Sequence, residues 1–90
     1  MQAYDWDEHN EDHVQEHGVQ PWEVEDALCD PNRLVVAASN VRNERRWAIL
    51  ASTEDGRLLF SVFTKRGDAI RIVTSRPASP REARHYRNQK

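Results

Sequence analysis

Short glycine-bearing turns between apolar segments constrain the fold of this chain most strongly. Three such segments follow one another, from Arg46 to Ser52, from Arg57 to Thr64 and from Ala69 to Ser75. The turns between them are Glu54-Asp55-Gly56 and Arg66-Gly67-Asp68. Connections of this length favour antiparallel hairpins. The nearly continuous apolar run from Leu58 to Phe63 predicts the central strand, and Leu34 to Ala38 predicts a fourth strand before the other three.

The first eighteen residues carry the signals of a short strand and a helix. Tyr4 to Trp6 predicts a short additional strand at the N-terminal side. Asp7 is suited to cap a polar helix from Glu8 to His17, and Gly18 is suited to end it.

A second helix is predicted immediately after the first. Gln20 stands at its cap, Pro21 takes the first helical position, and the prolyl turn Asp30-Pro31-Asn32 breaks it. Val19 lies opposite Val24 as a hydrophobic staple. The stripe expected to be buried comprises Trp22, Val24, Ala27 and Leu28. Cys29 lies on the same apolar side, so we expect it to be packed rather than reactive.

The strands are followed by a last helix, because Ser79-Pro80-Arg81-Glu82 is a capping box that begins a helix running to about Asn88. The chain is therefore predicted to be a single α+β domain over residues 1–90. Two short N-terminal helices and one C-terminal helix would cover one face of a four-stranded antiparallel sheet, with Tyr4 to Trp6 as an extra strand. The opposite face would stay open.

Length and composition exclude several classes of protein. A chain of 90 residues has a thin core, so neither a deep cofactor cavity nor a cofactor is expected. No apolar run is long enough to span a membrane, and the N-terminus is acidic where a secretory signal would be basic, so we expect a cytoplasmic protein. A single cysteine, Cys29, excludes an intramolecular disulfide and a zinc site built from several cysteines.

Charge is distributed very unevenly along the chain. The first thirty residues hold ten Asp and Glu and no Lys or Arg, whereas all thirteen basic residues lie from Arg33 to Lys90 with five acids. The net charge of −2 therefore conceals a −10 segment followed by a +8 segment. A basic surface attracts phosphate, and an acidic partner, either another chain or this chain's own N-terminus, can mask it.

Several short motifs occur together in one order. They are Trp6-Asp7-Glu8, Asn10, His17-Gly18-Val19, Pro21, Glu23-Val24-Glu25, Ala27-Leu28, Gly56-Arg57-Leu58-Leu59, Arg71-Ile72-Val73-Thr74-Ser75-Arg76, Glu82 and Tyr86. In this order and spacing the chain resembles the BrnT family of small toxins. The resemblance implies a fold similar to RelE-type ribonucleases and cleavage of RNA without metal. It also implies a toxin–antitoxin hetero-oligomer, whose antitoxin, usually a ribbon-helix-helix protein, blocks the toxin and binds their shared promoter.

Metal-free cleavage of RNA needs a base, an acid and cations that stabilise the charge developing on phosphorus. Arginines on strands suit the last role because strands are stiff mounts. Arg71 and Arg76 are the first candidates and Arg46 is the next, and these three also coincide best with arginines of the family pattern. Pairing of Arg46 with Glu44 is the alternative for that residue.

Further candidates for RNA contact lie at strand ends and on the last helix. They are Arg57, Lys65, Arg66, Arg84 and Tyr86. Arg57 could instead only finish a turn, and Tyr86 could anchor the last helix on the sheet rather than stack on a base. Trp47 and Phe63 are expected in the core, or as apolar anchors for a partner if one sheet face is uncovered.

Histidines supply the candidates for acid and base. His17 fits the family element but is more simply a residue at a helix end, and His85 lies beside Tyr86 pointing in another direction. His9, His13 and His17 recur every four residues, yet three successive turns spread too far for one ion, so no metal site is predicted.

The first helix departs from the family, whose members commonly carry Lys or Arg where this chain has Glu11, Asp12 and Glu16. An acidic helix repels RNA unless it lies away from the basic face. Either the sheet and the last helix alone bind RNA, or catalysis has been lost. Two other functions therefore stay open: a non-catalytic module that acts with a DNA-binding antitoxin as a repressor, and a plain nucleic-acid binder.

Overall fold

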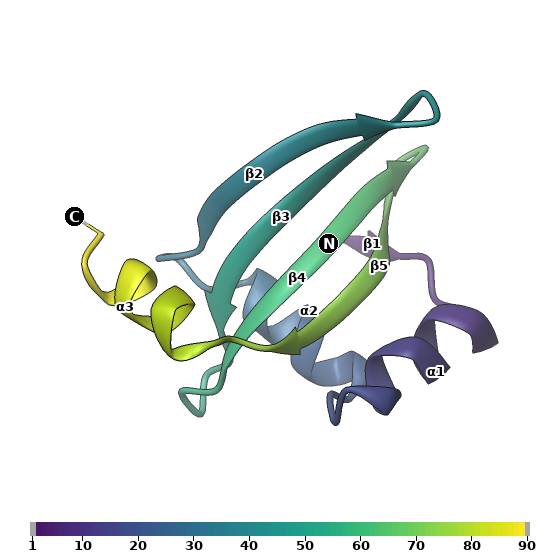
Figure 1. Cartoon of the computed structure of the whole chain (residues 1–90). Helices are drawn as coiled ribbons and strands as arrows, with labels where there is room; N and C mark the ends of the chain where they lie inside the picture. The colour runs from purple at the N-terminus through teal and green to yellow at the C-terminus, as the bar shows by residue number, and fades with distance from the viewer. Residues whose placement is uncertain (1, 90) are drawn as a thin grey trace.

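The computed structural model describes residues 2–89 and consists of one five-stranded sheet with three helices (Figure 1). The elements in chain order are β1 (Ala3–Tyr4), α1 (Glu8–Glu16), α2 (Pro21–Leu28), β2 (Leu34–Val41), β3 (Glu44–Ser52), β4 (Leu58–Arg66), β5 (Ala69–Pro77) and α3 (Pro80–Arg87). The strand order is β1-β5-β4-β3-β2. The predicted α+β class is confirmed, and the apolar run of β4 occupies the centre as predicted.

The sheet is mixed rather than purely antiparallel, so the predicted four-stranded antiparallel sheet is wrong in this respect. The short strand β1 pairs in parallel with β5, with Tyr4 opposite Ile70. Beyond this pair the Asp5 amide donates to the Ile70 carbonyl, and the Asn10 side chain donates to the Ile72 carbonyl at 3.0 Å. Asp5 and the Asn10 side chain of α1 thus continue the hydrogen bonding to β5 beyond the end of β1. These contacts hold the two-residue strand β1 parallel to β5.

The β2–β3 hairpin is longer than predicted. The predicted strands ended at Ala38 and restarted at Arg46, whereas the ladder continues to Val41 and Glu44. Arg42 and Asn43 form the connection with φ of 52° and 66°. Positive φ at both central residues defines a type I′ turn, which suits the twist of the strands. This turn contains no glycine, so its signal in the sequence is weak.

The helix ends follow the predicted caps. Asp7 caps α1 and forms a reciprocal capping box with Asn10, and Ser79 forms the same arrangement with Glu82 at α3. Gly18 has φ of 77°, a conformation that side chains disfavour, and the chain leaves α1 there.

The core lies between one face of the sheet and the helices α1 and α2. The fully buried residues of this core are Val14, Val19, Val24, Ala27, Ile49, Ala51, Leu59 and Ile72. Two predictions for α2 are wrong, since Trp22 is 60% exposed and Cys29 is exposed. Trp22 lies two residues from Val24, about 200° around the helix, and Cys29 follows the last helical residue.

The helix α3 does not share the core face, contrary to the expectation that all helices cover one face. Leu50 alternates with Ile49 and Ala51 on β3 and therefore points to the opposite face. A hollow on that side is lined by Leu50 with Arg81, Glu82 and His85 of α3. Figure 1 shows α3 on the opposite side of the sheet's lower end from α1.

We predict that Asn10→Ala lowers the free energy of unfolding by about 2–3 kcal/mol. The Asn10 side chain is buried, accepts from the Asp7 amide and donates to the carbonyls of Asp5 and Ile72. Urea unfolding followed by circular dichroism measures the loss. Asn40→Ala, at an exposed position of β2, is the control and should change stability by less than about 0.5 kcal/mol. An equal effect of both variants would contradict the role of Asn10.

Candidate functional site

A β-bulge in β5 determines which side chains share a face of the sheet. Val62 pairs with Thr74, whereas the next residue, Phe63, pairs with Ile72. Val73 is thus the extra residue of the bulge. Strict alternation would send Arg71 and Arg76, five residues apart, to opposite faces.

Cross-strand pairing shows that the bulge brings the two arginines to the same face. Arg71 pairs with Thr64, which pairs with Arg46, and Arg76 pairs with Phe60. Thr64 and Phe60 are four residues apart on β4 and therefore point the same way. The structure thus places all three predicted catalytic arginines on the face opposite the core, with Arg46 and Arg71 at one end and Arg76 at the other. We call this the open face, formed by Arg46, Ala48, Leu50, Phe60, Val62, Thr64, Arg71, Thr74 and Arg76.

One end of the open face is a hollow of about 230 Å³ beside Arg71. Its lining includes His9, Glu44, Arg46, Thr64, Arg66 and Arg71. The Arg71 side chain is only 14% exposed, and its Nη2 lies 2.9 Å from Asp7 Oδ2 while its Nη1 lies 3.5 Å from Asp5 Oδ2. The Asn10 amide first, and then Arg71, lower the pKa of Asp7. Arg71 is therefore aimed by the acidic N-terminal segment.

The two other arginines of the hollow share one carboxylate. Arg46 Nε lies 2.8 Å from Glu44 Oε2, and Arg66 Nη2 lies 3.9 Å from Glu44 Oε1. The alternative considered for Arg46, pairing with Glu44, is thus present. Both arginines remain partly exposed, so the pairs are weak and can be exchanged for a phosphate.

The other end of the open face carries Arg76. Its guanidinium binds Glu82 of α3 through two hydrogen bonds of 2.9 and 3.0 Å. It also lies over the Phe60 ring at 4.4 Å from the centroid. Arg76 is the main cause that lowers the pKa of Glu82 to about 2. The ion pair holds α3 against this end of the sheet.

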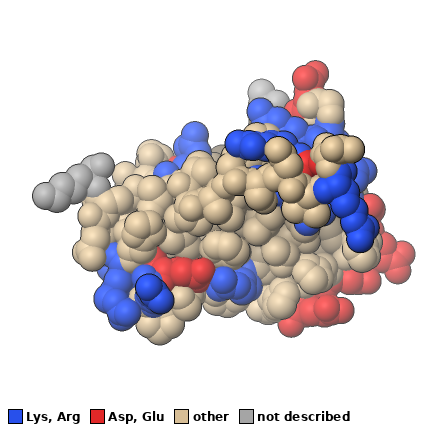
Figure 2. Space-filling model, turned by 45° about the horizontal axis from the view of Figure 1, so that its top comes forward, with Lys and Arg blue, Asp and Glu red and all other residues tan. Residues whose placement is uncertain are grey.

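The charged side chains on the surface are also divided between the two ends of the open face. Figure 2 shows two groups of cationic side chains, one toward the β2–β3 hairpin and one toward α3, with an uncharged band between them. Acidic side chains gather on the side where α1 lies. Asp12 and Glu16 of α1 are exposed there. The acidic helix therefore lies beside the open face rather than across it.

The remaining predicted contacts are dispersed. Arg57 binds both carboxylate oxygens of Glu23 at 2.8 and 2.9 Å and donates to the Gly18 carbonyl, so it ties the β3–β4 turn to the start of α2. Lys65 lies on the core-side face near Trp47, and Arg84 is exposed on α3. Of this second group of cations, Arg66 alone lines the arginine hollow.

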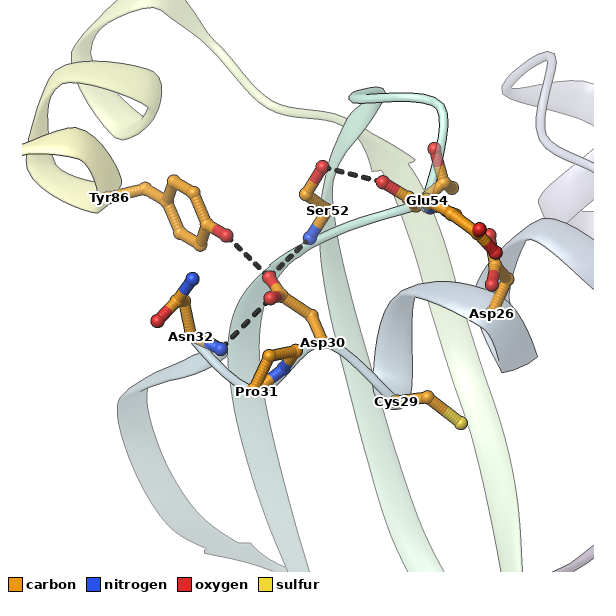
Figure 3. A pocket seen from close by; sticks show the side chains of 9 residues that line it. Asp26, Cys29, Asp30, Pro31, Asn32, Ser52, Glu54 and Tyr86 are labelled. Atoms are coloured by element: carbon orange, nitrogen blue, oxygen red, sulfur yellow. Dashed lines mark hydrogen bonds between the residues drawn. The ribbon is translucent and has the colours of Figure 1, made fainter.

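Tyr86 anchors α3 instead of facing the arginines. Its hydroxyl donates to Asp30 Oδ2, which also accepts from the Ser52 amide, while Asp30 Oδ1 accepts from the Asn32 amide (Figure 3). Burial would raise the pKa of Asp30, but these hydrogen bonds lower it. Burial first, and then Asp30, raise the pKa of Tyr86 to about 12.

The hollow around this cluster is about 450 Å³. Its carboxylates belong to Asp26, Asp30 and Glu54. An acidic lining repels a phosphodiester, so this larger hollow is a poor place for RNA.

The predicted acid and base candidates lie elsewhere. His17 is exposed at the end of α1 with its ring 5.2 Å from that of His13. His85 lines the apolar hollow under α3. The histidine beside Arg46 and Arg71 is His9, which stands out in the sequence only through the four-residue spacing of His9, His13 and His17. Its position beside these arginines follows from the placement of the β1–α1 connection against β5, which the sequence alone does not give.

Among residues 2–89, no group of three or more His, Cys, Asp and Glu side chains is arranged to hold a metal ion. Within the same range, no helix has the length and apolar character needed to cross a membrane.

A protein-family model described as "Ribonuclease toxin, BrnT, of type II toxin-antitoxin system" matches residues 6–82. The chain belongs to the BrnT family. The suspected resemblance is thereby confirmed, and the family is one of ribonuclease toxins whose role implies an antitoxin partner and an RNA substrate. No curated protein matches the chain closely. The match includes His9 and the three arginines of the open face, whereas Arg84, His85 and Tyr86 lie beyond it.

We predict that Glu82→Gln removes a pH-dependent part of the stability of this BrnT protein. The folded-state pKa of Glu82 is depressed from 4.5 to about 2, so the pair with Arg76 stabilises fully above about pH 4.5 and is lost as pH falls toward 2. The difference in unfolding free energy between wild type and variant should therefore be about 1 kcal/mol near neutral pH and shrink on acidification. Urea unfolding across this range measures it. Glu54→Gln, at an exposed turn, is the control, and a constant difference for Glu82→Gln would contradict the ion pair.

Proposed function

We propose that this BrnT protein is a cytoplasmic, metal-independent endoribonuclease toxin that binds RNA on the open face. The single observation that supports this most is the bulge at Val73, which aligns Arg71 and Arg76 with Arg46. Neighbouring strands lie about 4.8 Å apart, so Arg46 and Arg71 are separated by about 10 Å at the backbone, and their long side chains can reach one phosphate. Arg76 lies about 13 Å from Arg71 in the strand direction, because their partners on β4, Phe60 and Thr64, are four residues apart. Arg76 therefore contacts a different phosphate of the same RNA.

The proposed reaction takes place in the arginine hollow. The ribose 2′-oxygen attacks the adjacent phosphorus as a base removes its proton, the bond from phosphorus to the 5′-oxygen breaks, and an acid protonates that leaving oxygen. The products are a 2′,3′-cyclic phosphate and a 5′-hydroxyl. Arg46 and Arg71 stabilise the charge on the phosphoryl oxygens. His9 is the imidazole in the hollow that can act as the base or the acid.

The carboxylates now bound to the arginines define the binding step. RNA must replace Asp5 and Asp7 at Arg71, and Glu44 at Arg46. The ion pairs at Arg46 and Arg76 are partly exposed and so are weak, whereas a phosphodiester in the hollow can contact Arg46 and Arg71 together. Asp5 and Asp7 therefore hold the Arg71 side chain in position in the free protein, and the substrate phosphate replaces them when RNA binds.

The partner proposed is a cognate antitoxin of the ribbon-helix-helix type in a hetero-oligomer with the toxin. An acidic or amphipathic segment that folds on binding would cover the open face, because it matches both the uncharged middle of that face, where Ala48, Leu50 and Phe60 lie, and the cations at its ends. It would compete with RNA for the same arginines.

A non-catalytic module that represses transcription with its antitoxin is the second candidate. The observation that favours it is that Arg46, Arg71 and Arg76 are all paired with carboxylates of the same chain. In this alternative the ion pairs are purely structural.

We predict that purified wild-type protein cleaves a labelled RNA in EDTA and that Arg71→Ala/Arg76→Ala lowers the rate by at least about 100-fold. Loss of two phosphate contacts removes stabilisation of the transition state and of the bound strand. Arg81→Ala/Arg87→Ala, which removes two exposed charges from α3, is the charge-matched control. Circular dichroism checks folding of each variant, and mass analysis of the fragments identifies 2′,3′-cyclic ends.

If the folded double variant still cleaved RNA, the proposal that the active site lies on the open face would be contradicted. Absence of cleavage by folded wild type, also with ribosomes and added metals, would favour the repressor module. Salt-dependent RNA binding without cleavage would instead identify a plain nucleic-acid binder.

We also predict that His9→Ala lowers the cleavage rate by about 100-fold or more, because a positioned acid or base contributes at least that factor. His13→Ala, on the same helix, should keep the wild-type rate and serves as the matched control. Cleavage rates of wild type and both variants, measured side by side at one pH, test this. If His17→Ala or His85→Ala lowered the cleavage rate more than His9→Ala did, the acid or base would instead be one of the two histidines predicted from the sequence.

A further inference from the structure

A stacked aromatic pair lies on the core-side face of the sheet, near the end that carries the β2–β3 and β4–β5 turns. Trp47 and Phe63 are cross-strand neighbours on β3 and β4, with ring centroids 5.5 Å apart and ring planes inclined by 21°. Phe63 packs against the core cluster. The core therefore holds Phe63 in place, and Phe63 holds the indole of Trp47. Trp47 is only half-buried, so part of its indole is accessible.

Two cations lie over the indole ring. The guanidinium of Arg45 lies 6.0 Å and the ammonium of Lys65 lies 5.9 Å from the Trp47 ring centroid. Both residues are exposed, and within residues 2–89 neither has a carboxylate at ion-pair distance. This distinguishes them from Arg46, Arg71 and Arg76, which are paired.

We propose that Trp47 is a stacking platform for an unpaired nucleobase of RNA and that Arg45 and Lys65 bind the phosphates on either side of that base. The inference rests on the proposed function, since it takes RNA as the ligand. Single-stranded nucleic acid offers a π-face and a phosphate on each side of the base, and an aromatic ring with two cations close to it can bind both. Because a paired base does not expose its face, the platform selects single-stranded RNA over duplex.

The platform is connected to the arginine hollow by strand alternation. Arg45 and Arg46 are consecutive on β3, and Lys65 and Arg66 are consecutive on β4, so each pair presents one cation to either face. An RNA strand that passes around the hairpin end would meet cations continuously. Its base would rest on Trp47 while a phosphate a few nucleotides away enters the hollow.

The test measures binding separately from cleavage. A fluorescently labelled single-stranded oligonucleotide with 2′-O-methyl riboses cannot be cleaved by 2′-oxygen attack, so anisotropy reports affinity alone. Trp47→Leu should weaken binding by on the order of 5- to 100-fold, and Trp47→Phe by less, because Phe keeps an aromatic face. Trp22→Leu is the matched control, since Trp22 is the most exposed tryptophan and lies on α2. Circular dichroism verifies folding.

Equal affinity of wild type and Trp47→Leu would overturn the platform and leave the aromatic pair as packing or a protein-docking surface. Wild-type affinity for a duplex as high as for a single strand would also overturn it. The proposed ribonuclease is judged apart from this, by cleavage of unmodified RNA in EDTA. A platform confirmed without cleavage, or cleavage without a platform, would therefore identify which proposal fails.

Discussion

The bulge at Val73 is the constraint on which the arrangement of the site depends. It lets Ile72 face the core while both Arg71 and Arg76 face away from it. A regular strand could satisfy the core at Ile72 and still place one arginine on the open face, but not both. The bulge thus lets one strand, whose alternation in the sequence looks inconsistent, contribute Ile72 to the core and both arginines to the open face.

The uneven charge along the sequence is resolved partly inside the fold. N-terminal carboxylates pair with arginines of the basic segment, as Glu23 does with Arg57 and Asp7 with Arg71. The first pair joins secondary-structure elements, whereas the second lies at the candidate site. Masking by the chain's own N-terminus, one of the two alternatives drawn from the sequence, therefore occurs at Arg71, through Asp5 and Asp7 just before α1.

Local signals in the sequence predicted local structure well. The caps at Asp7 and Ser79 and the glycine at position 18 placed helix ends within about a residue, because each acts through neighbouring backbone groups. Non-local features could not be obtained in this way. The parallel pairing of β1 and the position of His9 beside Arg71 depend on contacts between β5 and a segment about 65 residues earlier in the chain. The bulge depends on the backbone pairing within the β4–β5 hairpin, which the residue types alone do not reveal.

The most direct test of the open face is an NMR titration of the isotopically labelled protein with a non-cleavable single-stranded oligonucleotide. Arginine side-chain Nε–Hε signals report each guanidinium separately. We expect the largest shifts at Arg46, Arg71 and Arg76, with smaller ones at Arg57, which is tied to Glu23 on the other side of the sheet. Shifts confined to the acidic hollow around Asp30, or absent from Arg71 and Arg76, would contradict RNA binding on the open face.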